Sequence, residues 1–137
     1  MSPLDQVRWI DLPSSEDERG VLTAVEAGLD VPFEIRRVFF MHHVSADRGG
    51  HAHRETDQLV VAAAGSFEVG LFDGERSASY DLDSPGRGLY VPRMLLVDLK
   101  RFSAGAVCLV LASTHYDMSR SLRSREEFLS AVREAAH

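Results

Sequence analysis

Short runs of apolar residues, separated by glycine, proline and polar residues, occupy most of the chain up to about residue 116. Several runs alternate apolar and polar residues, a period of two that is typical of strands with one buried face. Strands are therefore predicted in "VRWIDL", "VLTAVE", "FEIRRVFFMHHV", "DQLVVAAAG", "SFEVGLFDGERSASYDL", "GLYV", "LLVDL" and "GAVCLVLAS". Asp73-Gly74 predicts a hairpin turn, and "PSSEDERG" is predicted to be a polar loop. This spacing of strands and turns indicates an antiparallel sandwich or barrel.

The last part of the chain has a different pattern, "SREEFLSAVREAA". Ser124 with Glu127 three residues later is a capping-box signature, and Phe128, Leu129 and Val132 recur at helical spacing. We expect a short amphipathic helix here that packs on the barrel. No linker separates it from the strands, so residues 1–137 are predicted to form a single all-β domain with a C-terminal helix.

Composition narrows the possible functions. The 137 residues are 45% hydrophobic and 26% charged, as in ordinary globular proteins, and the formal charge of −6 argues against a nucleic-acid surface. The first residues, "MSPLDQVRWIDL", lack the apolar run of a signal peptide, and no run is long enough to span a bilayer. The single cysteine, Cys108, cannot form an internal disulfide. We therefore expect a cytoplasmic protein with no nucleic-acid or membrane partner.

The segment "RGGHAHRETDQ", residues 48–58, carries the candidate chemistry. In a strand His51 and His53 point to the same side, which we expect to be the interior of the barrel. Metal-dependent cupins combine such a pair with an acid and a third histidine, but Gln58 and Val97 occupy those two positions. A transition metal normally needs three or more strong ligands, so we expect no metal and no other cofactor. Two core histidines held by hydrogen bonds remain an alternative, and acid–base chemistry is favoured because imidazole titrates near neutral pH.

An ordered set of motifs resembles the sugar-nucleotide 3,4-ketoisomerases, small WxcM-like cupins that act on dTDP-4-keto-6-deoxyglucose. The resemblance covers nearly the whole chain, and its centre, "RGGHAH" joined to "GLYVP" and "LASTHYD", is its specific part. The other matching segments are "ERGVLTAVE", "VPFEIRRVFF", "GSFEVGLFDG", "DSPGRGLYVP", "FSAGAVCLVLASTHYD" and "REEF".

The resemblance implies a cupin-type double-stranded antiparallel β-helix, or jelly-roll barrel. It also implies a homodimer whose N-terminal strands are exchanged or cross, and a dTDP-linked keto-deoxysugar bound in the barrel without a metal. The implied reaction moves the keto group from C4 to C3 through an enediol(ate).

The resemblance also implies roles for single residues. His51 would be the base that removes the C3 proton, and His53 its partner in orientation or proton transfer. Arg48 and Gln58 match positions that line the pocket. Arg19 and Arg37 match basic positions near the entrance, where a diphosphate needs charge-assisted hydrogen bonds.

The chain departs from the family pattern at several positions. Family members usually have tyrosines where Phe39 and Phe40 stand, and one of them lies against the sugar and can carry a proton. Phenylalanine retains the packing of the ring but has no hydroxyl group. The tryptophan-histidine pair of the family is replaced by Leu96 and Val97, and its closing "DYIRDY" is "SRSLRSR" here.

Three explanations of the lost hydroxyl stay open. His42, His43 or Tyr90 supplies the missing group, or the substrate differs, or the reaction has been lost. The corresponding functions are a 3,4-ketoisomerase, a related carbohydrate-acting cupin such as an epimerase or a cyclase of a natural-product pathway, and a non-catalytic nucleotide-sugar binder. For the isomerase, Phe39 and Tyr90 join the arginines and Gln58 as candidate substrate-binding residues.

Overall fold

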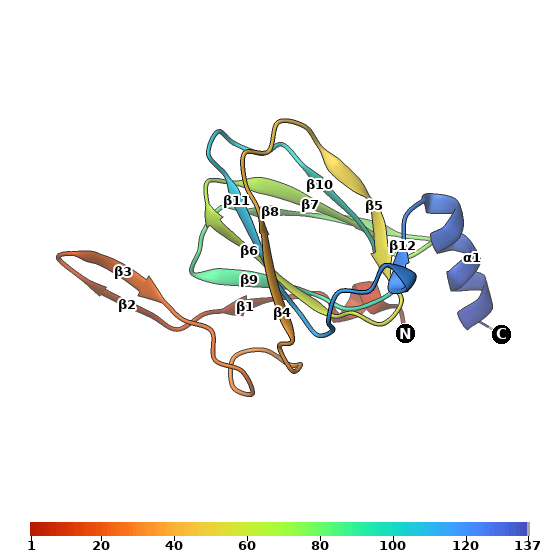
Figure 1. Ribbon diagram of the computed structural model, residues 1–137, viewed down its shortest axis with the longest axis horizontal. Coiled ribbons are helices and arrows are strands. Elements are labelled where there is room, and N and C mark those ends of the chain that lie inside the picture. Colours follow the sequence, from red (N-terminus) through yellow and green to blue (C-terminus); the bar gives the residue numbers. More distant parts are fainter. Residues whose placement is uncertain (137) are drawn as a thin grey trace.

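Two five-stranded antiparallel sheets face each other in the computed structural model, which describes residues 1–136 (Figure 1). In spatial order, the first sheet contains β1 (Arg8–Asp11), β9 (Arg87–Val91), β6 (Gln58–Ala64), β11 (Val107–Ala112) and β4 (Arg37–Met41). The second contains β12 (Ser121–Leu122), β5 (Arg48–His53), β10 (Leu96–Lys100), β7 (Phe67–Phe72) and β8 (Ser77–Leu82). Strands distant in sequence are neighbours in both sheets, as in a cupin-type jelly roll. The predicted all-β antiparallel fold is confirmed.

The predicted turn at Asp73-Gly74 connects β7 and β8. The Asp73 carboxylate accepts hydrogen bonds from the backbone N–H groups of Glu75 and Arg76, both at 2.7 Å. Gly74 has a φ of 109°, a backbone conformation that glycine adopts without steric cost. The turn chemistry therefore fixes this hairpin.

The prediction for residues 13–20 was wrong, because part of the expected polar loop is a strand. Residues Ser14–Asp17 form β2, which pairs with β3 (Gly20–Thr23) in a two-stranded sheet. Every residue of β2 is exposed, so no buried face gives it a period-two pattern. Backbone pairing and a hydrogen bond of 2.8 Å between the Ser14 and Thr23 hydroxyls connect the two strands of this hairpin, which projects away from the two large sheets (Figure 1).

The main core lies between the two large sheets. Along β6, Val60 and Ala62 belong to this core, whereas Leu59 and Val61 belong to a second cluster with residues 25–35 of the segment between β3 and β4. Both faces of β6 are therefore buried, which explains why its sequence is apolar at consecutive positions. The interior-facing side chains leave a pocket toward one side of the core.

The C-terminal helix α1 (Arg125–Ala135) confirms the helix prediction. The Ser124 hydroxyl accepts a hydrogen bond from the backbone N–H of Glu127 at 3.1 Å, as an N-cap does. Phe128 and Ala131 pack against Ala52, Leu96 and Leu122 on the outside of the second sheet. Two 3₁₀ turns, η1 (Pro3–Gln6) and η2 (Met118–Arg120), complete the described elements.

Among residues 1–136, no helix is long and apolar enough to cross a membrane.

Candidate active site

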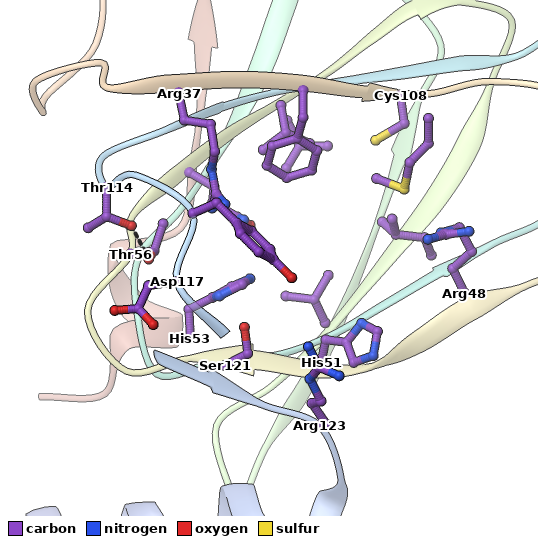
Figure 2. A pocket seen from close by; sticks show the side chains of 18 of the residues that line it. Arg37, Arg48, His51, His53, Thr56, Cys108, Thr114, Asp117, Ser121 and Arg123 are labelled. Carbon is purple, nitrogen blue, oxygen red and sulfur yellow. Dashed lines mark hydrogen bonds between the residues drawn. The ribbon is translucent and has the colours of Figure 1, made fainter. Parts of the chain in front are cut away.

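A pocket of about 550 Å³ opens between the two large sheets. This volume lies in the range of sites that hold a small-molecule ligand. Apolar side chains of β4, β10 and β11 form part of its wall: Phe39, Met41, Val97, Leu99, Cys108 and Val110. The polar side chains come from β4, β5, the start of β6 and the segment from Thr114 to Arg123 (Figure 2).

The start of β5 has a local structure that places several polar side chains on the pocket. Gly50 has a φ of 71°, and its backbone N–H donates a hydrogen bond of 2.9 Å to the Asp98 carboxylate. The register between β5 and β10 shifts, because Val97 pairs with His51 and Leu99 with Arg48. Such an irregularity re-aims side chains along a strand. Arg48 and His51 therefore both line the pocket although three positions separate them, which regular alternation would not allow.

His51 and His53 both line the pocket, as their spacing on a strand predicts. Figure 2 shows the two rings directed into the cavity from the same strand. His51 is exposed at the pocket, whereas His53 is half-buried. Burial, with smaller contributions from the Arg37 and His51 charges, lowers the pKa of His53 below its ordinary value. His53 is therefore a neutral imidazole near pH 7, with one nitrogen able to accept a proton and one able to donate.

Three arginines of the pocket differ from most arginines of the surface. Arg37, Arg48 and Arg123 form no salt bridge with any residue of the described chain. Six others pair with carboxylates, at Asp17–Arg19, Glu34–Arg36, Arg54–Glu134, Asp5–Arg76, Asp57–Arg93 and Glu68–Arg101. Unpaired guanidinium groups around one cavity favour an anionic ligand.

The remaining predicted site residues divide into two sets. Phe39 and Gln58 line the pocket, together with the histidines, Arg37 and Arg48. Arg19 does not, because it lies at the β2–β3 hairpin and bonds to Asp17 at 2.7 Å. Tyr90 does not either, since it faces the outer cluster and stacks on Phe33 with ring centroids 6.2 Å apart. Strand alternation is the reason, because the neighbours Leu89 and Val91 take the inward positions of β9.

The two histidines considered as replacements for the missing tyrosine hydroxyl also lie outside the main pocket. His42 and His43 line a separate, more polar hollow at the segment between β4 and β5. Tyr116, which the sequence interpretation did not single out, lines the main pocket and brings a phenol to it. Its place within "LASTHYD", a motif of the resemblance, was the signal that could have identified it.

Other pocket residues were missed because they follow the last long strand. Thr114, Asp117, Ser121 and Arg123 belong to the segment after β11 that returns to the sheet edge as β12. Ser121 pairs with His53, and Leu122 pairs with Ala52. A hydrogen bond of 2.7 Å between the Thr56 and Thr114 hydroxyls attaches the beginning of this segment to the pocket wall. The two-residue strand β12 is too short to give a pattern in the sequence.

The cysteine of the pocket wall is not a nucleophile. Cys108 is fully buried, and burial raises the pKa of its thiol to about 12. A thiol with such a pKa stays protonated at physiological pH. Within the described residues, no group of three or more His, Cys, Asp or Glu side chains is arranged to hold a metal ion. The polar side chains that line the pocket are imidazoles, guanidinium groups, hydroxyls, the Gln58 amide and the Asp117 carboxylate, and the imidazoles suit proton transfer on an anionic ligand.

Comparisons with known proteins find a matching family and similar chains. Residues 5–133 match the family described as FdtA, WxcM-like, C-terminal. The TDP-4-oxo-6-deoxy-alpha-D-glucose-3,4-oxoisomerase of Aneurinibacillus thermoaerophilus is 38% identical over 114 residues, 82% of each chain. A 3,4-ketoisomerase structure from Helicobacter canadensis is 34% identical, with a TM-score of 0.89 over 93% of this chain and 97% of the other. A mutant of the 3,4-ketoisomerase QdtA from Thermoanaerobacterium thermosaccharolyticum, in complex with TDP-4-keto-6-deoxyglucose, is 28% identical, with a TM-score of 0.89 over 93% and 94%.

Proposed function

Because the chain belongs to the FdtA family of WxcM-like proteins, we propose that it is a sugar-nucleotide 3,4-ketoisomerase. Its substrate is a dTDP-4-keto-6-deoxyhexose, and the keto group moves from C4 to C3. The observation that carries the proposal is the position of His51 and His53 on one face of β5, inside a pocket lined by three arginines without carboxylate partners. The name of the 38% identical relative and the sugar nucleotide in the QdtA complex support the substrate class.

The two imidazoles account for the proton transfers of this reaction without a metal. His51 takes the proton from C3, the C–H electron pair forms a C3–C4 double bond, and the C4 carbonyl becomes an oxyanion. The proton on the His51 imidazolium exchanges with solvent. The imidazolium then protonates C4 with the electron pair of the C3–C4 double bond, as the O3–H bond breaks and its electrons form the C3 ketone. Neutral His53 takes the proton from O3 and delivers it to O4. Each atom and electron pair of the 4-keto sugar is conserved in the 3-keto product.

The dTDP group supplies most of the affinity in this proposal. Arg48 and Arg123 are exposed at the pocket and have free guanidinium groups, so they can bind the diphosphate through charge-assisted hydrogen bonds. The apolar walls contact the sugar and exclude water from the reacting carbons.

Product analysis tests the proposed function. The protein is incubated with dTDP-4-keto-6-deoxyglucose, and ¹³C NMR follows the carbonyl signal. We expect the C4 ketone to be replaced by a C3 ketone. Unchanged substrate, or inversion at a carbon with the ketone still at C4, would contradict isomerase activity.

Phe39 gives one specific argument for a second function, a non-catalytic nucleotide-sugar binder. Its ring lines the pocket at a position where the family usually has a tyrosine, so one proton-carrying group is absent there. A binder would retain affinity for dTDP but leave the sugar unchanged in the NMR experiment.

The exposed apolar side chains support a homodimer as part of the proposal. Val21 and Leu22 on the hairpin, and Val38 and Phe40 on the edge strand β4, are all more than half exposed. A projecting hairpin with exposed apolar side chains and an unpaired sheet edge favour exchange or crossing of N-terminal strands with a second copy. Sedimentation equilibrium should give a dimer, and L22D should shift it toward the monomer.

The dimer would also give Arg19 a role. Its hairpin projects away from its own pocket, so we propose that Arg19 reaches the diphosphate in the pocket of the other copy. Mixing H51N with R19Q tests this complementation after subunit exchange. One pocket of the mixed dimer then has both residues intact, and activity should exceed the sum of the separate variants. No gain on mixing would place Arg19 outside the site.

A further inference from the structure

The side chain of Arg37 lies deeper in the pocket than those of Arg48 and Arg123. Its Nε atom is buried and has no hydrogen-bond partner among the described residues. An unpaired buried donor is costly, and in a native protein such a group calls for an explanation. Figure 2 shows Arg37 extending from β4 into the cavity toward His53, whereas Arg48 lies on the other side of the histidine pair.

Two aromatic rings hold the guanidinium group of Arg37 in place. Its Cζ atom lies 5.1 Å from the centroid of Phe39 and 5.6 Å from that of Tyr116. Contacts of this kind orient a guanidinium group without consuming its N–H donors. Arg37 is therefore a pre-oriented set of donors directed at whatever occupies the pocket beside His53.

We propose that Arg37 binds the reacting oxygen of the sugar and stabilises the enolate, while the diphosphate is bound elsewhere. The inference rests on the proposed isomerase function and deepens it. A solvated diphosphate suits the exposed Arg48 and Arg123. A partly desolvated donor next to the acid–base pair suits an oxyanion, because electrostatic stabilisation is strongest where water is excluded.

The chemistry requires such a donor. When the C3–H proton moves to His51, the former carbonyl π electrons leave a negative charge on O4. After O3 loses its proton and the C3 ketone forms, the charge is gone. The donor therefore forms a hydrogen bond to the neutral C4 carbonyl of the bound substrate and a stronger one to the O4 anion of the intermediate and its flanking transition states. A group of this type acts mainly on kcat, contributes some binding of the keto sugar, and contributes none to binding of the dTDP part.

Arg37 has a second effect on the site, through its charge. The positive guanidinium disfavours protonation of His53 and contributes, after burial, to the lowered pKa of that imidazole. His51 on the same strand contributes as well. The other charged or titratable side chains that line the pocket are Arg48, Cys108, His115, Tyr116, Asp117 and Arg123.

The first experiment compares R37M and R37K with the wild type, after circular dichroism has shown that both variants fold. Calorimetry measures their affinity for dTDP and for dTDP-4-keto-6-deoxyglucose. We expect unchanged affinity for dTDP and weaker affinity for the keto sugar nucleotide. Equal losses for both ligands, or no loss for either, would overturn the proposal. This comparison needs no turnover, so it stands even if the wild type proves inactive and the proposed function fails.

The second experiment measures kinetics at saturating substrate. Loss of one oxyanion donor typically lowers kcat by about 10²–10³-fold, which we expect for R37M. The acid limb of its kcat/KM profile should move to higher pH, because removal of the positive charge raises the pKa of His53. R37K retains the charge but lacks the planar fork, so it should lose kcat with the acid limb in the wild-type position. Wild-type kcat in both variants would contradict the assignment.

Discussion

The molecule has two histidine pairs, and only one of them faces the pocket. His51 and His53 occupy alternate positions of β5, and both line the main pocket. His42 and His43 are consecutive and exposed, and they follow β4. Their rings meet because His43 adopts a left-handed backbone with a φ of 54°, and their Nδ1 atoms lie 2.6 Å apart in a hydrogen bond. His42 and His43 are hydrogen-bonded to each other at the surface, whereas His51 and His53 line the pocket and can contact a ligand. Residue type alone therefore does not identify the acid–base group, but strand spacing and surroundings do.

The largest effect should distinguish the two pairs directly. A positioned general base contributes roughly 10²–10⁴-fold to rate, so H51N should lower kcat by about that factor. Affinity for dTDP should change little, since the nucleotide is bound by other groups. H42N is the matched control and should turn over like the wild type. Steady-state kinetics measures both, and equal losses in the two variants would remove the distinction between the pairs.

The second prediction concerns the arginines around the pocket pair. A hydrogen bond to a charged group is worth about 1.5–3 kcal/mol, so R48Q and R123Q should each weaken dTDP binding by roughly ten- to hundredfold. R101Q is the control, because Arg101 is highly exposed and does not line the pocket. Its Nε atom pairs with the Glu68 carboxylate at 3.5 Å. Calorimetry should also show weaker binding in high salt, which screens exposed phosphate contacts. Wild-type affinity in both variants would move the diphosphate to another site.

The third prediction uses the lowered pKa of His53. The imidazole of His53 binds a proton more tightly in the unfolded chain than in the folded protein. Protonation therefore lowers the free energy of unfolding as pH falls through the pKa of the unfolded state, about 6.5. The free energy of unfolding, measured by urea denaturation at pH 7 and pH 5, should therefore fall less in H53Q than in the wild type. Identical decreases would show that burial of His53 has no effect on stability.

The smallest effect concerns the two consecutive phenylalanines of β4. Phe39 lines the pocket, whereas Phe40 is 59% exposed and contacts His42, with ring centroids 5.7 Å apart. F39Y adds a hydroxyl beside the ligand and should raise kcat modestly. F40Y adds one at the surface and should leave kcat unchanged. A gain from F40Y alone would mean that the exposed side of β4 takes part in the reaction.

Much of the fold follows from local patterns. The hairpin at Asp73-Gly74 and the helix capped by Ser124 both depend on contacts between residues close in sequence, and both are confirmed. The exposed strand β2 has no buried face and so left no hydrophobic pattern. The two-residue strand β12 was equally invisible, although it places Ser121 beside His53.

The candidate site was predictable to a similar extent. The i, i+2 spacing placed His51 and His53 on one face without knowledge of the tertiary structure. Tyr90 was misplaced because its inward or outward direction depends on the register of β9, which no local pattern specifies. The sequence does not show that the Arg37 Nε atom is buried or that the Arg123 side chain lines the pocket. Both features depend on the pairing of β4 with β11 and of β12 with β5, which are distant in sequence.

The central claim is that the pocket histidines remove the proton from C3 of the sugar and deliver a solvent-exchanged proton to C4. The most direct measurement is turnover of dTDP-4-keto-6-deoxyglucose in D₂O, with ¹H NMR following the sugar protons in the wild type and H51N. The wild type should form the 3-keto sugar with solvent deuterium at C4, and H51N should leave the C3 proton in place. A wild-type protein that leaves the C3 proton and the C4 ketone unchanged, or an H51N variant that exchanges that proton at the wild-type rate, would contradict it.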